Sequence, residues 1–231
     1  MRFLHRWTVG KEAAEPHLNE DALICAGLKG RYAVSDGASE SFASRRWARI
    51  LASRYVRRLT IDRGWIEQSI ATYNSAFDRS VMSWSAQAAF DRGSFATLLG
   101  VQIDADSRGA SIMGVGDSLA VLDDGEGIRD TFPYTTPEQF QANPLLLSTI
   151  HERNQAIDIA DVTTHWHFGA ISSPKLFCMT DAIGAWLLSD RRERMRCLRE
   201  LHQPGDFFEL VETARADGTM RRDDTSLLVI G

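Results

Sequence analysis

Aspartates stand at the ends of several apolar runs in this 231-residue sequence. A single aspartate in such a place is well explained as a turn residue, because its side chain hydrogen-bonds the backbone nearby. Several carboxylates brought together at one sheet edge repel one another unless cations neutralise them. Mg²⁺ and Mn²⁺ prefer oxygen ligands of this kind. The set therefore favours a divalent-cation site, and its members are Asp21, Asp36, Asp117, Asp181, Asp223 and Asp224.

The elements that must position these aspartates are predicted from hydrophobic spacing. Apolar runs predict strands over 22–26, 31–35, 95–103, 110–115, 119–122, 176–180 and 225–230. Helical spacing predicts helices over 42–55, 66–88, 183–189, 191–202 and 205–216. Ser39 or Ser41 is expected to cap the first helix and Asp62 the second. Residues 126–170 are predicted to be mostly loop, with a short helix near 144–151.

The order of these elements predicts the fold class. Short turns between strands favour antiparallel sheets, and the helices arrive in blocks and do not alternate with strands. The sequence therefore predicts an α+β layered domain that spans residues 1–231, and it disfavours a Rossmann fold.

The amino-acid composition disfavours several classes of function. Lysine and arginine number 26 against 31 acidic residues, so the net charge of −5 lacks the overall basic character of a nucleic-acid-binding protein. The three cysteines form no C-x-x-C pair, which disfavours a zinc ribbon or a thioredoxin motif. No apolar stretch reaches the length of a membrane span, and the first residues lack the apolar core of a signal peptide. We expect a cytoplasmic protein that binds neither nucleic acid nor a membrane.

Six short motifs follow one another in a fixed order between residues 19 and 230. Together they resemble the metal-dependent serine/threonine protein phosphatases of type 2C, the PPM family, in a short bacterial form. The motifs are Asn19-Glu20-Asp21-Ala22, Val34-Ser35-Asp36-Gly37, Gly93-Ser94-Phe95-Ala96-Thr97, Val115-Gly116-Asp117-Ser118, Met179-Thr180-Asp181-Ala182 and Asp223-Asp224-Thr225-Ser226-Leu227. The resemblance implies a four-layer α-β-β-α sandwich, in which two antiparallel sheets are flanked by helix pairs.

The resemblance also implies a centre of two Mn²⁺ or Mg²⁺ ions. Asp36 would bridge the two ions, and the Gly37 carbonyl would bind one of them. Asp181 and Asp223 would complete the other. Two such ions lower the pKa of the water between them, and the resulting hydroxide would attack phosphorus in line.

Further residues gain roles from the same resemblance. Glu20 and Asp21 would orient metal-bound waters. Asp117 would help to hold a third, weaker ion, although Ala185 stands where many members have a further aspartate. Pro16 stands where well-known members carry an arginine that grips phosphate. Arg2, Arg6 and Lys11, near the N-terminus, are the candidates for the cation that replaces this arginine, and the choice among them is left open.

The implied activity is hydrolysis of phosphoserine or phosphothreonine on proteins, with a serine/threonine kinase or its target as the partner. The alternative is a pseudophosphatase, a phospho-signalling binding module without turnover. A phosphatase of small metabolites is less favoured. None of the cysteines needs a role in this chemistry.

Two other features admit a functional reading. His165 and His167 share one side of a predicted strand, but no third zinc ligand stands at a recognisable spacing. An arginine-rich helix face over 45–58 could bind an acidic partner, although such faces are more commonly exposed to solvent without a binding role.

Overall fold

Two five-stranded antiparallel sheets form the centre of the computed structural model, which describes residues 1–12, 15–58, 61–169 and 171–231. One sheet has the order β1 (Phe3–Val9), β12 (Thr225–Ile230), β11 (Lys175–Met179), β7 (Leu119–Asp123) and β8 (Ile128–Phe132). The other has the order β10 (Thr163–His167), β6 (Gly109–Val115), β5 (Leu98–Ile103), β3 (Arg31–Ser35) and β2 (Ala22–Ala26).

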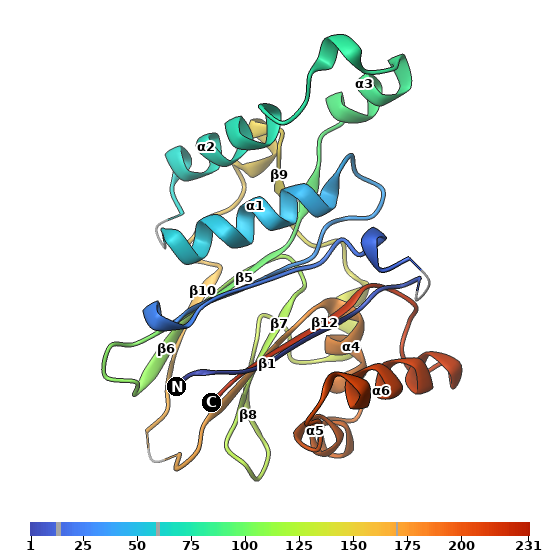
Figure 1. Cartoon of the computed structure of the whole chain (residues 1–231). Helices are drawn as coiled ribbons and strands as arrows, with labels where there is room; N and C mark the ends of the chain where they lie inside the picture. Colours follow the sequence, from blue (N-terminus) through green and yellow to red (C-terminus); the bar gives the residue numbers. More distant parts are fainter. Residues whose placement is uncertain (13–14, 59–60, 170) are drawn as a thin grey trace.

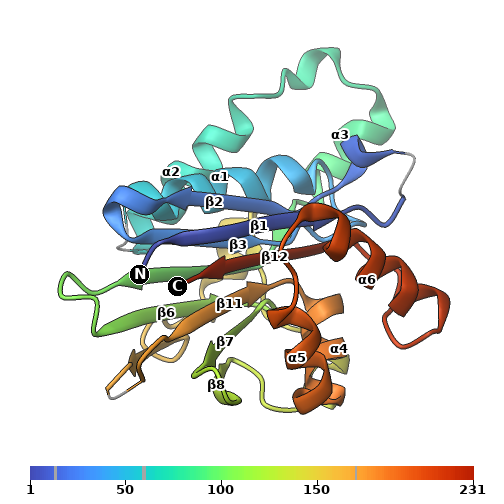
Figure 2. The ribbon, with the colours of Figure 1, turned by 60° about the horizontal axis from the view of Figure 1, so that its bottom comes forward.

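Helices cover the outer face of each sheet (Figures 1 and 2). Helices α1 (Ser44–Arg57) and α2 (Arg63–Asn74) lie over the sheet that contains β3, and α3 (Trp84–Asp91) extends beyond them. Helices α4 (Asp181–Ser189), α5 (Arg191–Arg199) and α6 (Pro204–Ala216) lie over the sheet that contains β12. The expected four-layer sandwich is confirmed, with three helices and not a pair on the β12 side.

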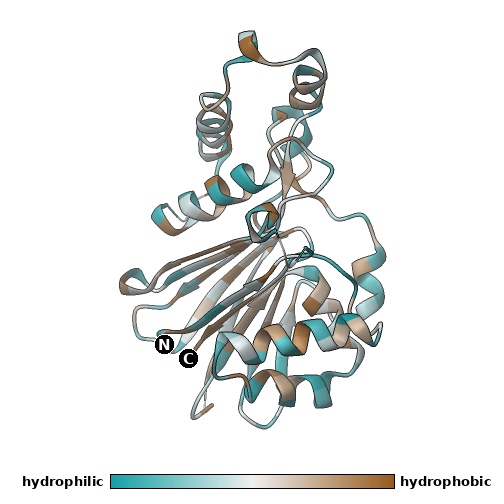
Figure 3. Ribbon diagram, turned by 45° about the vertical axis from the view of Figure 1, so that its right-hand side comes forward, coloured by the Kyte–Doolittle hydropathy of each residue, from teal (hydrophilic) through white to brown (hydrophobic). Residues whose placement is uncertain are grey.

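Three hydrophobic cores separate the four layers, and strand alternation assigns residues to them. In β3, Tyr32 and Val34 point into the core between the sheets, whereas Ala33 packs toward α1. In β12, Leu228 points between the sheets and Leu227 toward the helices. Because both faces of these strands are buried, they read as continuous apolar runs. Figure 3 shows this contrast between hydrophobic strands and helices of mixed character.

The short elements complete the chain. They are the 3₁₀ turns η1 (Pro16–Leu18), η2 (Gly27–Lys29), η3 (Arg79–Val81), η4 (Pro137–Gln141) and η5 (His151–Asn154), and the paired two-residue strands β4 (Phe95–Ala96) and β9 (Leu147–Ser148). In the described ranges, no helix combines the length and the apolar character that crossing a membrane requires.

Several predicted elements need correction. The helix expected over 66–88 is divided into α2, η3 and α3, because Asp78 and Ser83 each accept a backbone hydrogen bond that starts a new turn. Helix α1 begins after Ala43, which has a left-handed φ of 51°, so neither Ser39 nor Ser41 caps it. Asp62 caps α2 as expected, by accepting from the Trp65 amide at 2.7 Å.

The region 126–170 differs most from its prediction. It contains β8, β9 and β10, and turns η4 and η5 lie on either side of β9 where a short helix near 144–151 was expected. Strand β1, at the N-terminus, was also not predicted. Strands β1, β8 and β10 lie at sheet edges, where one side of the backbone faces no partner strand, so polar residues interrupt their apolar pattern.

Candidate metal centre

A cavity of about 200 Å³ brings four of the predicted aspartates together. Asp36 follows β3, Asp117 lies in the turn between β6 and β7, Asp181 opens α4, and Asp223 precedes β12. The cavity therefore draws its carboxylates from both sheets. Its lining residues are Asp36, Gly37, Ala38, Ser39, Thr97, Asp117, Pro144, Leu146, Asp181 and Asp223.

Backbone hydrogen bonds fix the position of Asp36. Its amide donates to the Thr97 hydroxyl at 2.9 Å, and its carbonyl accepts from the Thr97 amide at 2.8 Å. The Thr97 hydroxyl also lies 2.7 Å from that of Ser118, the neighbour of Asp117. Thr97 thus joins the loops that carry two of the acidic residues, which is why the strand predicted over 95–103 is interrupted there.

Gly37 lets the end of β3 lie directly against the start of α1. A Cβ atom at this position would approach the Ser44 carbonyl carbon to 2.8 Å and its oxygen to 2.9 Å. Only glycine allows this approach, since real Cβ atoms do not come so close to backbone.

Three of the acidic side chains, those of Asp21, Asp36 and Asp117, have raised pKa values, and burial is the main cause. Burial raises the pKa of Asp36 well above its usual value, and the nearby charges of Asp21, Asp223 and Asp117 add to the effect. Burial, with Asp224 and Asp223 nearby, raises the pKa of Asp21 to about 7. Burial also raises the pKa of Asp117, although the Arg221 guanidinium opposes this shift. Concentrated negative charge of this kind is a binding site for cations.

Oδ1 of Asp21 and Oδ1 of Asp181 are buried and find no hydrogen-bond partner among the residues that the structure describes. An unpartnered buried polar atom is costly and calls for a ligand or water. The other oxygen of Asp181 pairs with Arg221, whose guanidinium also lies 3.3 Å from Oδ2 of Asp223. Arg221 therefore supplies part of the missing positive charge.

The residues present fit an open, hydrated cation site better than a closed cage. Within the described ranges, no three His, Cys, Asp or Glu side chains are already grouped closely enough to hold an ion. The Arg221 guanidinium lies between the carboxylates of Asp181 and Asp223 and contacts both. Mg²⁺ is commonly held by one or two carboxylates together with several waters, so this donor set suits it.

Glu20 and Asp21 lie beside the cavity and do not line it as the other four do. Glu20 accepts a hydrogen bond from the Ser44 hydroxyl and lies 3.4 Å from the Lys11 ammonium. Asp21 accepts from the Thr180 hydroxyl at 3.3 Å. Both positions suit the peripheral role expected of these residues.

From the sequence, Asp224 was predicted only as a member of the acidic set that favours a divalent-cation site, and the structure gives it a different role. The Asp224 side chain is buried and accepts from the amides of Lys11 and Glu20, each at 2.7 Å. It thereby ties the N-terminal acidic motif to the C-terminal one. The two adjacent aspartates therefore differ in role, because Asp223 lines the cavity and Asp224 binds backbone amides.

Two cations stand near the cavity. The Lys11 ammonium donates to the hydroxyl of Ser39, a lining residue, at 2.8 Å. Arg221 is half-exposed and contacts two lining aspartates. Lys11 was among the candidates for the missing phosphate-gripping group, whereas Arg221 was not foreseen.

The other candidates do not form a comparable site. His165 Nε2 lies 3.0 Å from Asp104, and the rings of His165 and His167 are 4.4 Å apart, but no third zinc ligand joins them in the part of the chain that the structure describes. Burial raises the pKa of the Cys178 thiol to about 12, so it is protonated at neutral pH.

Solved structures of serine/threonine phosphatases share this fold. A bacterial serine phosphatase is 14% identical, with a TM-score of 0.61 over 99% of this chain and 97% of that one. The photosystem II phosphatase PBCP is 13% identical, with a TM-score of 0.62 over 97% and 96%. PstP/Ppp of Mycobacterium tuberculosis is 16% identical, with a TM-score of 0.58 over 91% of each chain. No family sequence model and no curated protein sequence matches.

These similarities confirm the resemblance at the level of the fold. The chain has the architecture of the type 2C phosphatases throughout its described length. A further structure, of the PstP catalytic domain, is 16% identical with a TM-score of 0.54 over 91% of this chain and 90% of that one, and it is in complex with two manganese ions.

Proposed function

We propose that this chain is a metal-dependent phosphatase that hydrolyses phosphoserine and phosphothreonine on proteins. The observation that carries the proposal is the cavity in which Asp36, Asp117, Asp181 and Asp223 meet beside Gly37. The similarity of the fold to serine/threonine phosphatases supports it, as does the manganese-bound structure of PstP.

In this proposal Asp36, Asp181 and Asp223 hold two Mn²⁺ or Mg²⁺ ions together with the Gly37 carbonyl, and Asp117 helps to hold a weaker third. When bound, such ions make hydroxide available near neutral pH and offset the charge of phosphoryl oxygens. The chain's own residues place these groups, because Thr97 fixes Asp36 and Asp224 fixes the segment that carries Glu20.

The chain also supplies positive charge to bind the phosphate group. Lys11 reaches Ser39 at the edge of the cavity, and Arg221 reaches Asp181 and Asp223. Either cation would attract phosphoryl oxygens, Arg221 with two parallel donors. Glu20 and Asp21 accept hydrogen bonds and orient water beside the cavity. We propose a single catalytic domain, a cytoplasmic setting and a kinase or its target as the partner.

Hydrolysis of p-nitrophenyl phosphate tests the proposal. The purified protein is assayed with EDTA, with Mg²⁺ and with Mn²⁺, beside Asp36→Asn, while calorimetry measures Mn²⁺ binding. Turnover that needs the metal and disappears in the variant is the expected result. Phosphoserine, phosphothreonine and phosphotyrosine peptides then define the substrate class. If the protein does not bind Mn²⁺, the proposed metal centre is contradicted.

The Arg221 contacts favour a second candidate, a pseudophosphatase that binds phosphorylated partners without turnover. A guanidinium that contacts Asp181 and Asp223 offsets part of the negative charge that cations need, since it carries one positive charge against two carboxylates. Mn²⁺ binding without turnover on any of the phosphopeptides would favour this candidate.

A further inference from the structure

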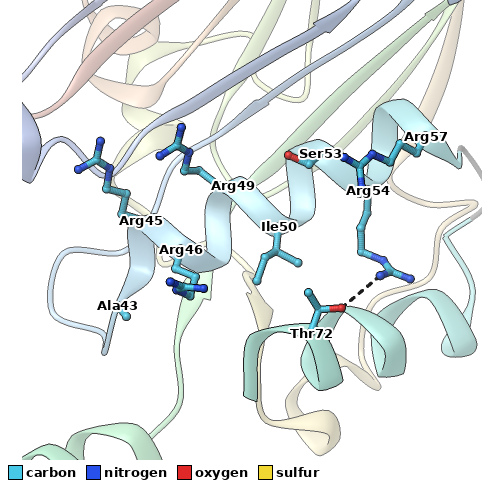
Figure 4. A pocket seen from close by; sticks show the side chains of 9 residues that line it. All are labelled: Ala43, Arg45, Arg46, Arg49, Ile50, Ser53, Arg54, Arg57 and Thr72. Atoms are coloured by element: carbon cyan, nitrogen blue, oxygen red, sulfur yellow. Dashed lines mark hydrogen bonds between the residues drawn. The ribbon is translucent and has the colours of Figure 1, made fainter. Parts of the chain in front are cut away.

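A groove outside the catalytic cavity lies along helix α1. It has a volume of about 760 Å³ and is bordered by Thr72 of α2. Figure 4 shows its arginine side chains distributed along the length of the helix. The lining residues are Ala43, Arg45, Arg46, Arg49, Ile50, Ser53, Arg54, Arg57 and Thr72, and we call this surface the α1 groove.

Positive charge in the α1 groove is not balanced by carboxylates. Of the described residues that line it, five are arginines and none is acidic. The ion pairs Arg58–Asp62 and Arg63–Glu67, at the end of α1 and the start of α2, involve residues outside the lining. The whole chain carries a net charge of −5, so the positive charge of the groove is opposite in sign to that of the protein as a whole. Similar charges packed together destabilise a helix face unless an anion binds there.

Arg54 shows most clearly that the groove lacks an anion. Among residues 1–12, 15–58, 61–169 and 171–231, its guanidinium bonds only to neutral oxygens, at 2.6 Å to Gln68 and 3.4 Å to Thr72. Its Nε atom is buried and has no acceptor within these ranges. This nitrogen is closed to water and equally to a bound peptide, so the positive charge that a partner would contact is that of the exposed Arg46, Arg49 and Arg57.

The groove begins at the edge of the catalytic cavity. Ala43 lines the groove, and the next residue, Ser44, packs on Gly37 and donates to Glu20. Arg45 donates to the carbonyl of His17, in the turn before the acidic motif. From this end, the 14 residues of α1 extend about 21 Å, which an extended peptide of about six residues would span.

We propose that the α1 groove binds an acidic segment of the phosphorylated protein substrate while its phosphorylated residue occupies the catalytic cavity. This inference rests on the proposed phosphatase function. Charge complementarity and continuity with the cavity identify the occupant. A nucleic acid fits less well, because no described residue of the lining is aromatic and able to stack with bases. A membrane surface fits less well because the charges lie in a recess beside α2.

The test uses two phosphothreonine peptides with a run of six glutamates, placed before the phosphorylated residue in one and after it in the other. Matched peptides carry glutamine in place of glutamate. Phosphate release gives KM and kcat for each at low and physiological salt. The wild-type protein is expected to have an approximately tenfold lower KM for one acidic peptide than for its glutamine match, and salt should reduce this preference.

The variant R49E/R57E reverses two exposed charges of the groove. Its control R129E/R192E makes the same change in net charge at exposed sites on β8 and α5. R49E/R57E should abolish the preference for the acidic peptide, and the control should retain it. Activity on p-nitrophenyl phosphate should be unchanged in both. Equal KM values of wild type and R49E/R57E for every peptide would overturn the proposal.

A binding measurement separates failure of this inference from failure of the proposed function. Fluorescence anisotropy follows a labelled hexaglutamate peptide without phosphate, so it needs no turnover. Binding that R49E/R57E loses and the control keeps supports the groove, even if p-nitrophenyl phosphate is not hydrolysed. Absence of binding, or arginine-dependent binding only to a labelled oligonucleotide or to phosphatidylserine vesicles, overturns it.

Discussion

The carboxylates around the cavity are proposed to hold cations by their negative charge, so removing the charge without changing the size of the side chain should be enough to abolish the site. Asp36 and Asp223 line the cavity, and the charge of Asp223 adds to the effect of burial in raising the pKa of Asp36. Asp36→Asn and Asp223→Asn keep the volume and remove one charge each. We expect metal-dependent hydrolysis to fall by more than about a hundredfold, since even residues that only support metal ligands cost ten- to a hundredfold. Circular dichroism should show that both variants remain folded, and full activity in either would remove that residue from the site.

Arg221 is expected to compete with cations for Asp181 and Asp223, because its guanidinium contacts both. Arg221→Ala should lower the dissociation constant for Mn²⁺ about two- to fivefold, the effect of removing one exposed ion-pair partner. Arg222→Ala is the matched control, because this neighbour donates to the Lys11 carbonyl and has no contact with either aspartate. Calorimetry measures both variants. Weaker Mn²⁺ binding in Arg221→Ala alone would show that the arginine supports the site.

The residues of the cavity were predictable because aspartates at strand ends carry an explicit signal in the sequence. Asp36, Gly37, Asp117, Asp181 and Asp223 all line it as expected. The roles of Thr97 and Asp224 were not predictable, because they depend on hydrogen bonds between segments far apart in the chain. Arg221 was not predictable either, because its contact with Asp181 joins residues that are far apart in the sequence and leaves no local pattern.

At the scale of elements, the interior strands were predicted accurately, whereas the edge strands β1, β8 and β10 were not. The bounds of β3 and β12 match the apolar runs, since both faces of these strands are buried, and the edge strand β2 also matches because its five residues are all apolar. The edge strands β1 and β10 mix exposed and buried positions, and their pairing with β12 and β6 decides their conformation. The start of α1 could not be predicted because packing on Gly37, and not a side-chain cap, sets it.

The contact between β3 and α1 should therefore be sensitive to a single methyl group. Gly37→Ala would force the backbone at Ser44 away from the strand end, because the new Cβ would lie 2.8 Å from its carbonyl carbon. We expect a loss of about 1–3 kcal/mol in the free energy of unfolding, the usual cost of overpacking. Hydrolysis should fall as well, because Asp36 and the start of α1 move apart. Urea denaturation measures the first effect and p-nitrophenyl phosphate the second.

Gly127→Ala provides the comparison for this prediction, since a Cβ there would meet nothing within 4 Å. This variant should keep both its stability and its activity. Equal stability of Gly37→Ala and Gly127→Ala would show that the β3–α1 contact relaxes without cost.

At the scale of the whole molecule, the two sheets bring together negative charge that the fold alone does not neutralise. Asp36 comes from one sheet and Asp223 from the other, so the cavity exists only when the sheets pack face to face. Its electrostatic cost is therefore a cost of folding, and it should be visible in the stability of the entire chain.

Without divalent cations, the free energy of unfolding should fall as pH rises from about 4 to about 7. Asp21 has a pKa near 7 in the folded protein, whereas an unfolded aspartate titrates near 4. Between these values the folded state holds the extra proton, so deprotonation on raising the pH favours the unfolded chain. Asp36 and Asp117, whose pKa values are also raised, act in the same direction. The contribution of Asp21 is at most about 4 kcal/mol.

Urea denaturation in EDTA at pH 5, 6 and 7.5 measures this decline, and Asp21→Asn identifies its source. His5 acts in the opposite sense near pH 6, because burial lowers its pKa, so the difference between wild type and Asp21→Asn is the informative quantity. This difference should grow as pH rises. Adding Mn²⁺ at pH 7.5 should restore stability, since an ion that binds only the folded state stabilises it. A wild-type protein that gains stability relative to Asp21→Asn over this range would contradict the charge repulsion from which the cation site is inferred.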